Sequence, residues 1–209
     1  MTEAVNIHPG LNLETDHYVD QPRSEVAIFG FWVFMMSDLI IFACFFATFL
    51  TMDNPMGKAG GPDGTQLFDL TSVAIQTGFL LCSSFAFGLA SVSLKYADGR
   101  GWTILWMVVS LALGLGFLTF ELRDFASIWA HGGTPQRSGY WSSFYALVGL
   151  HGLHVTVGAI WMAIMIAQLA VLGPRGVVKS RVLRLGLYWH FLDVVWIGIF
   201  SLVFLRALA

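Results

Sequence analysis

An uncharged stretch from Ser138 to Leu172 constrains this chain more than any other part of its sequence. Between Arg137 and Arg175 there is no Lys, Arg, Asp or Glu. A helix needs about 20 predominantly apolar residues to cross the hydrocarbon core of a bilayer. The stretch is therefore long enough to span a membrane with residues to spare, and we expect its helix to tilt or to protrude at one end.

The composition of the whole chain agrees with a membrane protein. Of its 209 residues, 56% are hydrophobic and 11% are charged, whereas soluble domains carry about a quarter charged residues. The formal net charge of -2 gives no electrostatic basis for a nucleic-acid partner. Cys44 and Cys82 lie in separate apolar runs and form no CxxC motif, so we expect buried thiols and not a disulfide or a metal site.

Further charge-poor segments, each long enough to span a bilayer, precede and follow this stretch. We predict five transmembrane helices in all, at about residues 28–51, 70–94, 102–122, 139–172 and 182–208. Polar or Gly- and Pro-rich turns separate them. The sequence therefore predicts an all-α integral membrane protein. Residues 1–25 would form a polar N-terminal tail, and residues 26–209 a five-helix transmembrane domain.

The distribution of basic residues predicts the orientation of this bundle. With the N-terminus in the cytoplasm, seven Lys and Arg residues fall on the cytoplasmic side and four on the other side. Cytoplasmic loops of membrane proteins carry an excess of these residues. The densest basic cluster lies at residues 175–184, before the last helix. We therefore expect a cytoplasmic N-terminus and a periplasmic C-terminus.

Ionisable side chains within the predicted spans are the candidate functional residues, because polar groups in a membrane are costly and usually face protein or water. They are Asp38, Glu121, His151, His154, His190 and Asp193. A rise of about 1.5 Å per residue from the helix ends sorts them by depth. We predict an outer cluster of Glu121, His151 and His154. His190 and Asp193 form an inner cluster, which Asp38 could join.

These residues could form a cofactor cage or proton path, or they could hold helices together. His151 and His154 lie on one face of one helix, so they cannot supply the two opposite axial ligands of a haem. With Glu121 they have the ligand types of a zinc or copper site, but only three candidates. We therefore expect hydrogen-bonded packing, and we assign no catalytic, cofactor-binding or metal-binding residue. For Asp38, a proton-relay role and a structural role both stay open.

Several phrases of the sequence resemble subunit III of the haem–copper terminal oxidases. They are FGFWVFMMSD, the GGPDG loop, RSGYWSSFYALVGLHGLHVTVG and LYWHFLDVVWIGIF. HGLHV and YWHFLDVVW are the most specific pair, and the likeness covers the chain from about residue 28 to its end. Within this family the chain is most similar to the subunit 3 of bo-type ubiquinol oxidases. Subunit III of a bacterial cytochrome c oxidase is the nearest alternative, and a small b-type cytochrome is a more distant one.

The resemblance implies a non-catalytic subunit of a proton-pumping, oxygen-reducing complex in the bacterial inner membrane. Haem and copper would belong to partner subunits, and this chain would hold no cofactor of its own. The implied partners are the catalytic subunit I, subunit II, a small subunit IV and phospholipid bound between the helices. The implied role is to support assembly and proton uptake. Asp38 falls where the family places a membrane-buried acid, commonly a Glu in the cytochrome c oxidases.

Overall fold

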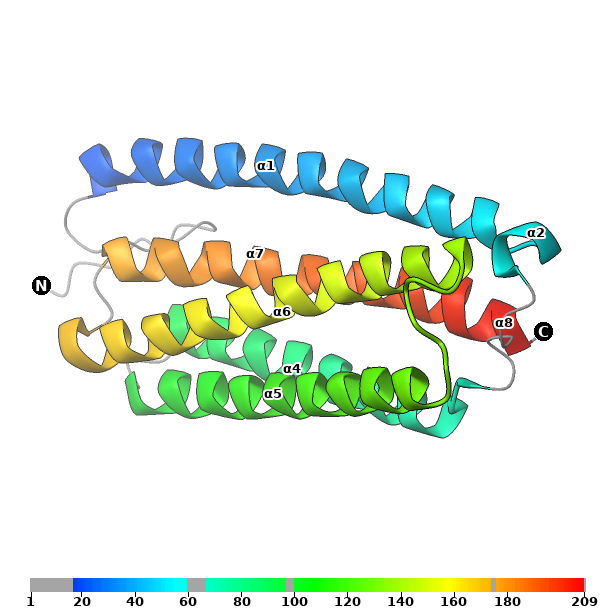
Figure 1. Ribbon diagram of the computed structural model, residues 1–209. Coiled ribbons are helices and arrows are strands. Elements are labelled where there is room, and N and C mark those ends of the chain that lie inside the picture. Colours follow the sequence, from blue (N-terminus) through cyan, green and yellow to red (C-terminus); the bar gives the residue numbers. More distant parts are fainter. Residues whose placement is uncertain (1–16, 60–66, 97–99, 174–175, 209) are drawn as a thin grey trace, which may run out of the picture.

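The structure is a computed structural model that describes residues 17–59, 67–96, 100–173 and 176–208. Every regular element in these residues is a helix. Five helices are long and apolar enough to cross a membrane. They are α1 (His17–Met52), α4 (Leu70–Tyr96), α5 (Arg100–Ala130), α6 (Gly139–Leu172) and α7 (Gly176–Ile199). Figure 1 shows them as one elongated bundle. The prediction of an all-α protein with five membrane-spanning helices is confirmed.

The short helical segments lie at one end of the bundle (Figure 1). They are α2 (Pro55–Lys58), the π-helical segment η2 (Phe200–Leu205) and α8 (Arg206–Leu208). Asp53 connects the end of α1 to two of them, because its carboxylate oxygens lie 3.2 Å from Lys58 Nζ and 3.4 Å from Arg206 Nε. Most of the predicted tail (residues 1–16) and the GGPDG loop lie outside the described residues.

The α6 helix has the predicted bounds. The side-chain oxygen of Ser138 accepts a hydrogen bond from the Trp141 N–H at 3.3 Å, which caps the first turn. Gly173 follows the last turn with a φ of 75°, a conformation that favours glycine. The uncharged stretch thus forms one helix from a serine cap to a terminal glycine.

Other helices extend beyond the ends that the sequence suggested. The α5 helix continues through Arg123 and Asp124, which were predicted to lie in a connection. Charged residues do not break a helix, and the first strong breaking signal is Gly132, whose φ is 85°. For the same reason α1 and α7 begin earlier than predicted, at His17 and Gly176. The apolar span within α1 still begins at Val26.

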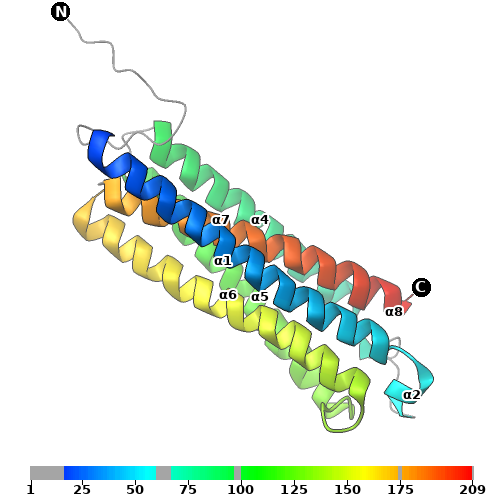
Figure 2. The same ribbon diagram turned by 90° about the horizontal axis from the view of Figure 1, so that it is seen from above.

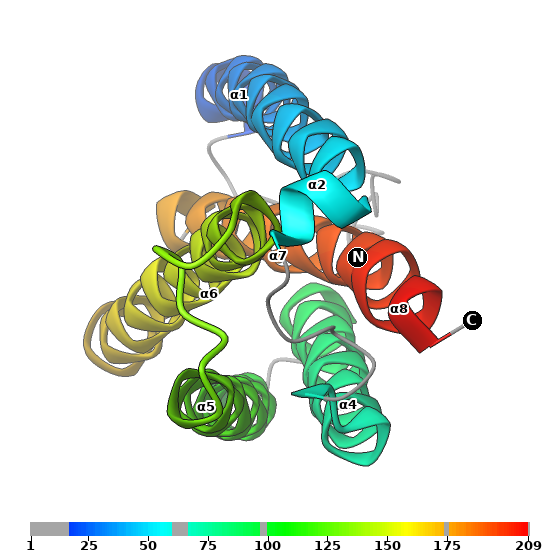
Figure 3. The same ribbon diagram turned by 45° about the vertical axis from the view of Figure 1, so that its right-hand side comes forward.

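The α7 helix is the central element of the bundle. In its apolar window, 56% of the residues are buried inside the chain, against 22% in α1. It packs on α4, α6 and α1, while α4 and α5 pack along each other. Figures 2 and 3 show α1 lying over α6 and α7, away from α5. The five spans therefore form a compact group around α7 with α1 on one flank.

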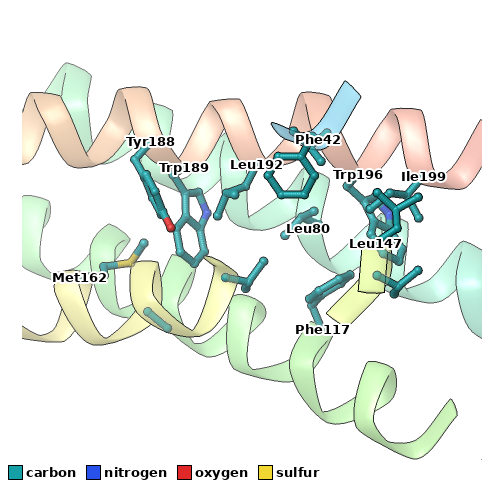
Figure 4. Close-up of a cluster of buried hydrophobic side chains, with 14 of the residues drawn as sticks. Phe42, Leu80, Phe117, Leu147, Met162, Tyr188, Trp189, Leu192, Trp196 and Ile199 are labelled. Carbon is teal, nitrogen blue, oxygen red and sulfur yellow. The ribbon is translucent and has the colours of Figure 1, made fainter. Parts of the chain in front are cut away.

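Trp189 of α7 fixes the spacing of three other helices. Its indole Nε1–H donates a hydrogen bond to Ser83 Oγ of α4 at 3.0 Å. A Cβ atom on Gly114 of α5 would lie 2.8 Å from the indole ring, and one on Gly158 of α6 would lie 2.9 Å from it. Figure 4 shows the ring pointing from α7 into the buried cluster. Both positions need glycine because the ring occupies the space of a side chain.

Cys44 and Cys82 are exposed at the surface of the bundle. The expectation that their thiols are buried inside the chain is therefore wrong. Both cysteines lie in apolar runs, as the sequence showed. In a membrane protein such a run can face lipid as well as the protein interior, because lipid tails are as apolar as a leucine side chain.

Candidate functional site: polar side chains within the membrane spans

Asp38 of α1 and His154 of α6 form an acid–base pair between two spans. Nε2 of His154 lies 3.2 Å from Oδ2 of Asp38, at ion-pair distance but without the angles of a hydrogen bond. Nδ1 of His154 lies 2.7 Å from the carbonyl oxygen of Leu150. A carbonyl can only accept, so Nδ1 carries a hydrogen. The other ring nitrogen, Nε2, therefore faces the Asp38 carboxyl group across the α1–α6 contact.

This pairing differs from the predicted clusters, which placed His154 with Glu121 and left Asp38 with the inner group. Both residues can be counted from the same end of the bundle, where α1 ends at Met52 and α6 begins at Gly139. Asp38 lies 14 residues before Met52 and His154 lies 15 residues after Gly139, so the two are level. The Asp38 side chain is buried and that of His154 is partly buried.

A third helix reaches the same pair. The hydroxyl of Tyr188 on α7 donates a hydrogen bond to the carbonyl oxygen of His154 at 2.9 Å. The Phe42 ring of α1 lies 5.2 Å from the His154 ring. Figure 4 shows Phe42 and Tyr188 among the buried side chains around α7. Tyr188 was not among the sequence candidates, which were limited to acids and histidines.

His151 is completely buried, with a relative exposure of 0%. Neither of its ring nitrogens has a hydrogen-bond partner among the described residues. Its ring lies edge-on to Phe117 of α5 at 5.8 Å and 5.4 Å from the ring of Trp196 on α7. The expected hydrogen-bonded packing of this histidine is therefore replaced by aromatic packing. His151 and His154 share a helix face but have different surroundings.

Glu121 lies against the backbone of α6. Its exposure is 4%, and a Cβ atom on Gly152 would lie 2.7 Å from its Oε2. Its Oε1 has no hydrogen-bond partner in the described part of the chain. The carboxylate borders a cavity of about 50 Å³ that Gln76 and Asp124 also line. Glu121 therefore helps to seat α5 on α6, but no hydrogen bond joins it to either histidine of α6.

A polar contact that sequence reasoning missed links α4 to α5 beside this cavity. Asp124 accepts hydrogen bonds from Gln76 Nε2 at 2.5 Å and from Ser72 Oγ at 2.9 Å. The predicted third span ended at residue 122, which left Asp124 outside the membrane, and Gln76 of the second span was not among the candidates. The signal was available in Gln76, an amide within an otherwise apolar run. Ser83 and Ser110 make a similar link, since each hydroxyl donates to the other's carbonyl.

His190 lies at the surface of the bundle, where α7 borders α4. Its side chain is 52% exposed, so the prediction of a buried histidine is wrong. Nδ1 lies 2.6 Å from Ser84 Oγ of α4 and 3.7 Å from Asp193 Oδ2. Asp193 is buried, and its Oδ1 has no hydrogen-bond partner among the described residues. The two residues share a face of α7 as predicted, but the rotation of the helix turns His190 outward.

The candidate metal ligands are dispersed. No three His, Cys, Asp or Glu residues lie close enough to hold a metal ion within the ranges that the structure describes. The polar side chains instead contact neighbouring helices: α1 with α6, α4 with α5, and α4 with α7. Such contacts are the usual means of joining helices in lipid.

The fold and these contacts define a multi-pass membrane protein whose spans are joined by small and polar residues. A family model described as cytochrome c oxidase subunit III matches residues 16–207. The chain belongs to the cytochrome c oxidase subunit III family, as the resemblance implied. Membership makes it a subunit of an oxidase complex, with other subunits of the complex as its partners.

Individual relatives cover most of the chain. It is 47% identical over 182 residues to the cytochrome bo(3) ubiquinol oxidase subunit 3 of Pseudomonas putida, which covers 87% of this chain and 86% of that protein. The protein of the same name from Pseudomonas aeruginosa is 41% identical, over 91% of this chain and 88% of its own. The quinol oxidase subunit 3 of Bacillus subtilis is 38% identical, over 87% of each chain.

Proposed function

We propose that this chain is subunit 3 of a bo-type ubiquinol oxidase, a proton-pumping quinol:oxygen oxidoreductase of an aerobic respiratory chain. The observation that carries the proposal is the likeness to proteins named as third subunits of quinol oxidases. It extends over 87% of the chain for relatives as different as those of Pseudomonas putida and Bacillus subtilis. The cytochrome c oxidase subunit III is the alternative, and the electron donor distinguishes the two.

Within the complex the chain has a structural role. We place haem and copper in the partner subunits, and we infer that this chain covers and stabilises the catalytic subunit I beside subunit II and a small subunit IV. Two observations support this role. His151 packs against aromatic rings, and His154 faces Asp38 across the α1–α6 contact. Lipid bound between the helices and support of proton uptake belong to the same proposal.

Removal of the chain tests this role. Complexes purified with and without it are compared by a time course of oxygen consumption with quinol, normalised to haem. The complex that lacks the chain should keep its haem spectrum and a substantial initial rate, then lose activity sooner during turnover. A partner that binds only the folded state stabilises it by mass action. No activity at all with haem and copper intact would show a catalytic role, and activity with cytochrome c alone would favour the alternative.

The absorption spectrum of the chain purified alone addresses the more distant alternative. We expect no Soret band, because the buried ring of His151 packs against Phe117 and Trp196, and Nε2 of His154 faces Asp38. A Soret band in proportion to the chain would identify a small b-type cytochrome and overturn the proposal.

We also propose that the chain lies in the bacterial inner membrane with its N-terminus in the cytoplasm and its C-terminus in the periplasm. The basic cluster at residues 175–184, at the start of α7, supports this orientation. Single cysteines at Met56, which is 89% exposed, and Val177, which is 58% exposed, lie at opposite ends of the bundle. In a variant without Cys44 and Cys82, an impermeant thiol reagent should label position 56 in intact cells and leave position 177 unlabelled. The reverse pattern would invert the orientation.

A further inference from the structure

His190 is a half-exposed polar side chain in the middle of a membrane span. The span runs from Val177 to Leu205, and His190 lies near its midpoint. If the chain were alone in the membrane, a side chain that points out of the bundle at this depth would contact the hydrocarbon of the lipid. Ionisable groups within spans almost always face a bundle interior or a water-filled cavity. His190 therefore needs a cover that the described residues do not supply.

Several other exposed polar side chains within the spans do not have this need. Their hydroxyl groups donate to a carbonyl oxygen three or four residues earlier on the same helix, at 2.7–2.8 Å. They are Ser37, Thr48, Thr119, Thr156 and Ser201. Such hydroxyls can face lipid because their hydrogen-bonding need is met internally. His190 is different: Ser84 lies at its Nδ1, and no partner for its Nε2 occurs among the described residues.

Asp193 gives a second, independent indication beside it. The residue is buried, with an exposure of 8% for the whole residue and 11% for its side chain, and its Oδ1 has no hydrogen-bond partner in the described ranges. Its other oxygen, Oδ2, is 3.7 Å from the ring of His190. A buried acceptor without a donor is costly. Two polar atoms on this part of α7 thus lack a hydrogen-bond partner among the described residues: Oδ1 of Asp193 and Nε2 of His190.

The neighbouring face of α4 carries small residues that are not buried within the described bundle. Ser84, Gly88 and Ser91 are four and three residues apart, so they share one face of the helix, and all three are partly exposed. A Cβ atom on Gly88 would meet nothing within 4 Å. The buried side of α4 is formed by other residues, such as Ser83 and Phe87. Small residues let a second helix approach closely in lipid.

We propose that Ser84, Gly88, Ser91 and His190 form the docking surface for one transmembrane helix of a partner subunit. The inference rests on the proposed function, which supplies such partners. The small residues of α4 give the partner's backbone a close approach. At mid-membrane depth the partner presents a neutral polar side chain, a hydroxyl or an amide, which can either donate to or accept from the imidazole. The surrounding surface is apolar, with Phe85 and Val194 exposed by 71% and 64%, and matches the rest of a membrane helix.

A bulky residue at Gly88 tests the surface without disturbing the chain, because space is open there. The complex is purified through a tag on this chain, and haem per chain is measured. Gly88→Leu should reduce the haem recovered by about tenfold or more, as expected when a side chain is forced into a packed contact. Gly78→Leu is the matched control, since Gly78 lies on another face of the same helix and also has nothing within 4 Å. It should leave the recovery unchanged.

The wild-type chain separates the two proposals. If it recovers no haem, the proposed function fails. If it recovers haem and Gly88→Leu does so equally, the docking surface is wrong. If the purified Gly88→Leu chain had a lower thermal midpoint than the Gly78→Leu chain, its lower haem recovery would be explained by misfolding. His190→Ala then decides the matter: it should weaken retention about threefold, the effect of one average interhelical hydrogen bond, and unchanged retention would overturn the proposal.

A photo-crosslinking amino acid at Val194, one turn from His190, identifies the occupant in the intact complex. We expect a single adduct with a transmembrane segment of another oxidase subunit, identified by mass spectrometry. An adduct with a second copy of this chain, with its own residues 1–16 or with phospholipid alone would each overturn the assignment. The same crosslinker at Val157 of α6, which is 51% exposed, serves as the control for adducts formed by any exposed residue.

Discussion

The α1 and α7 helices cross the same membrane but are packed in opposite ways. The apolar window of α1 has a mean hydropathy of 2.2 and is 22% buried, whereas that of α7 has a mean hydropathy of 1.7 and is 56% buried. The more apolar helix is the less buried one, the reverse of the pattern in water. Lipid tails are as apolar as the core, so apolar residues gain little by facing each other. Small and polar residues therefore mark the contact faces.

The contacts of the two helices differ in their balance of steric and polar groups. The α7 helix is held by large rings fitted against glycines, with Trp189 between Gly114 and Gly158. The α1 helix has a contact of this first kind at Phe46, which faces Gly198 of α7, but a contact of a second kind, the polar Asp38–His154 pair, also holds it. Steric contacts of the first kind tolerate no added atoms, whereas a polar contact of the second kind is worth about 0.6 kcal/mol on average. The comparison predicts that substitutions around α7 cost more than those on α1.

Gly158→Leu should have the largest effect. The added Cβ atom would lie 2.9 Å from the rings of both Trp189 and Tyr188. Overpacking of this kind costs about 1–3 kcal/mol and sometimes more. The check is the thermal midpoint of the chain in mild detergent, followed by size-exclusion chromatography. Gly149→Leu on the same helix is the control, because its Cβ atom would lie 4.0 Å from its nearest neighbour, a ring atom of Phe125. Equal losses in the two variants would remove the steric argument.

Trp189→Phe should be the next most damaging change, at about 1–2 kcal/mol. It removes the hydrogen bond to Ser83 and leaves part of the indole space empty. A double-mutant cycle with Ser83→Ala isolates the hydrogen bond, and we expect a coupling of about 0.6 kcal/mol. Trp102→Phe provides the comparison, since Trp102 is 57% exposed. Its effect should stay within about 0.5 kcal/mol. A larger loss of stability in Trp102→Phe would show that burial of the side chain within the bundle does not determine the cost of a substitution.

Asp38→Ala tests the polar attachment of α1. The variant leaves His154 without its facing group, and the expected loss is about 0.6 kcal/mol, with an upper value near 1.7 kcal/mol. Asp38→Asn should retain most of the stability, because the amide keeps a polar group of the same size opposite His154. His154→Ala combined with Asp38→Ala should cost less than the sum of the two single changes. Strict additivity in thermal denaturation would mean that the two side chains do not interact.

The smallest effect is expected for Thr156→Val on the exposed face of α6. The threonine hydroxyl donates a hydrogen bond to the Gly152 carbonyl oxygen of its own helix, so this hydrogen bond does not join α6 to another span. The nearly isosteric change should alter stability by less than about 0.5 kcal/mol. The same thermal assay measures it beside the other variants. A loss as large as that of Asp38→Ala would place an interhelical contact on this face.

Much of the architecture was predictable from the sequence because each span must be apolar over its whole length. The bounds of α6 follow from the uncharged stretch between Ser138 and Gly173. The ends of α5 were harder to predict, because Arg123 and Asp124 leave the apolar run without breaking the helix. Their charges mark where polarity increases, not where hydrogen bonding along the helix ends. The polar candidates were visible for the same reason, since an ionisable group stands out in an apolar run.

The sequence by itself determined that there are five spans and which rare polar residues lie in them. Only the tertiary structure decided their partners: His154 faces Asp38, His151 lies among aromatic rings, and His190 points outward. These outcomes depend on how each helix is rotated about its axis. In water a hydrophobic stripe reveals that rotation, because one face must avoid solvent. In lipid both faces are apolar, so the rotation is set by the close fit of glycines and rings, which lie far apart in the sequence.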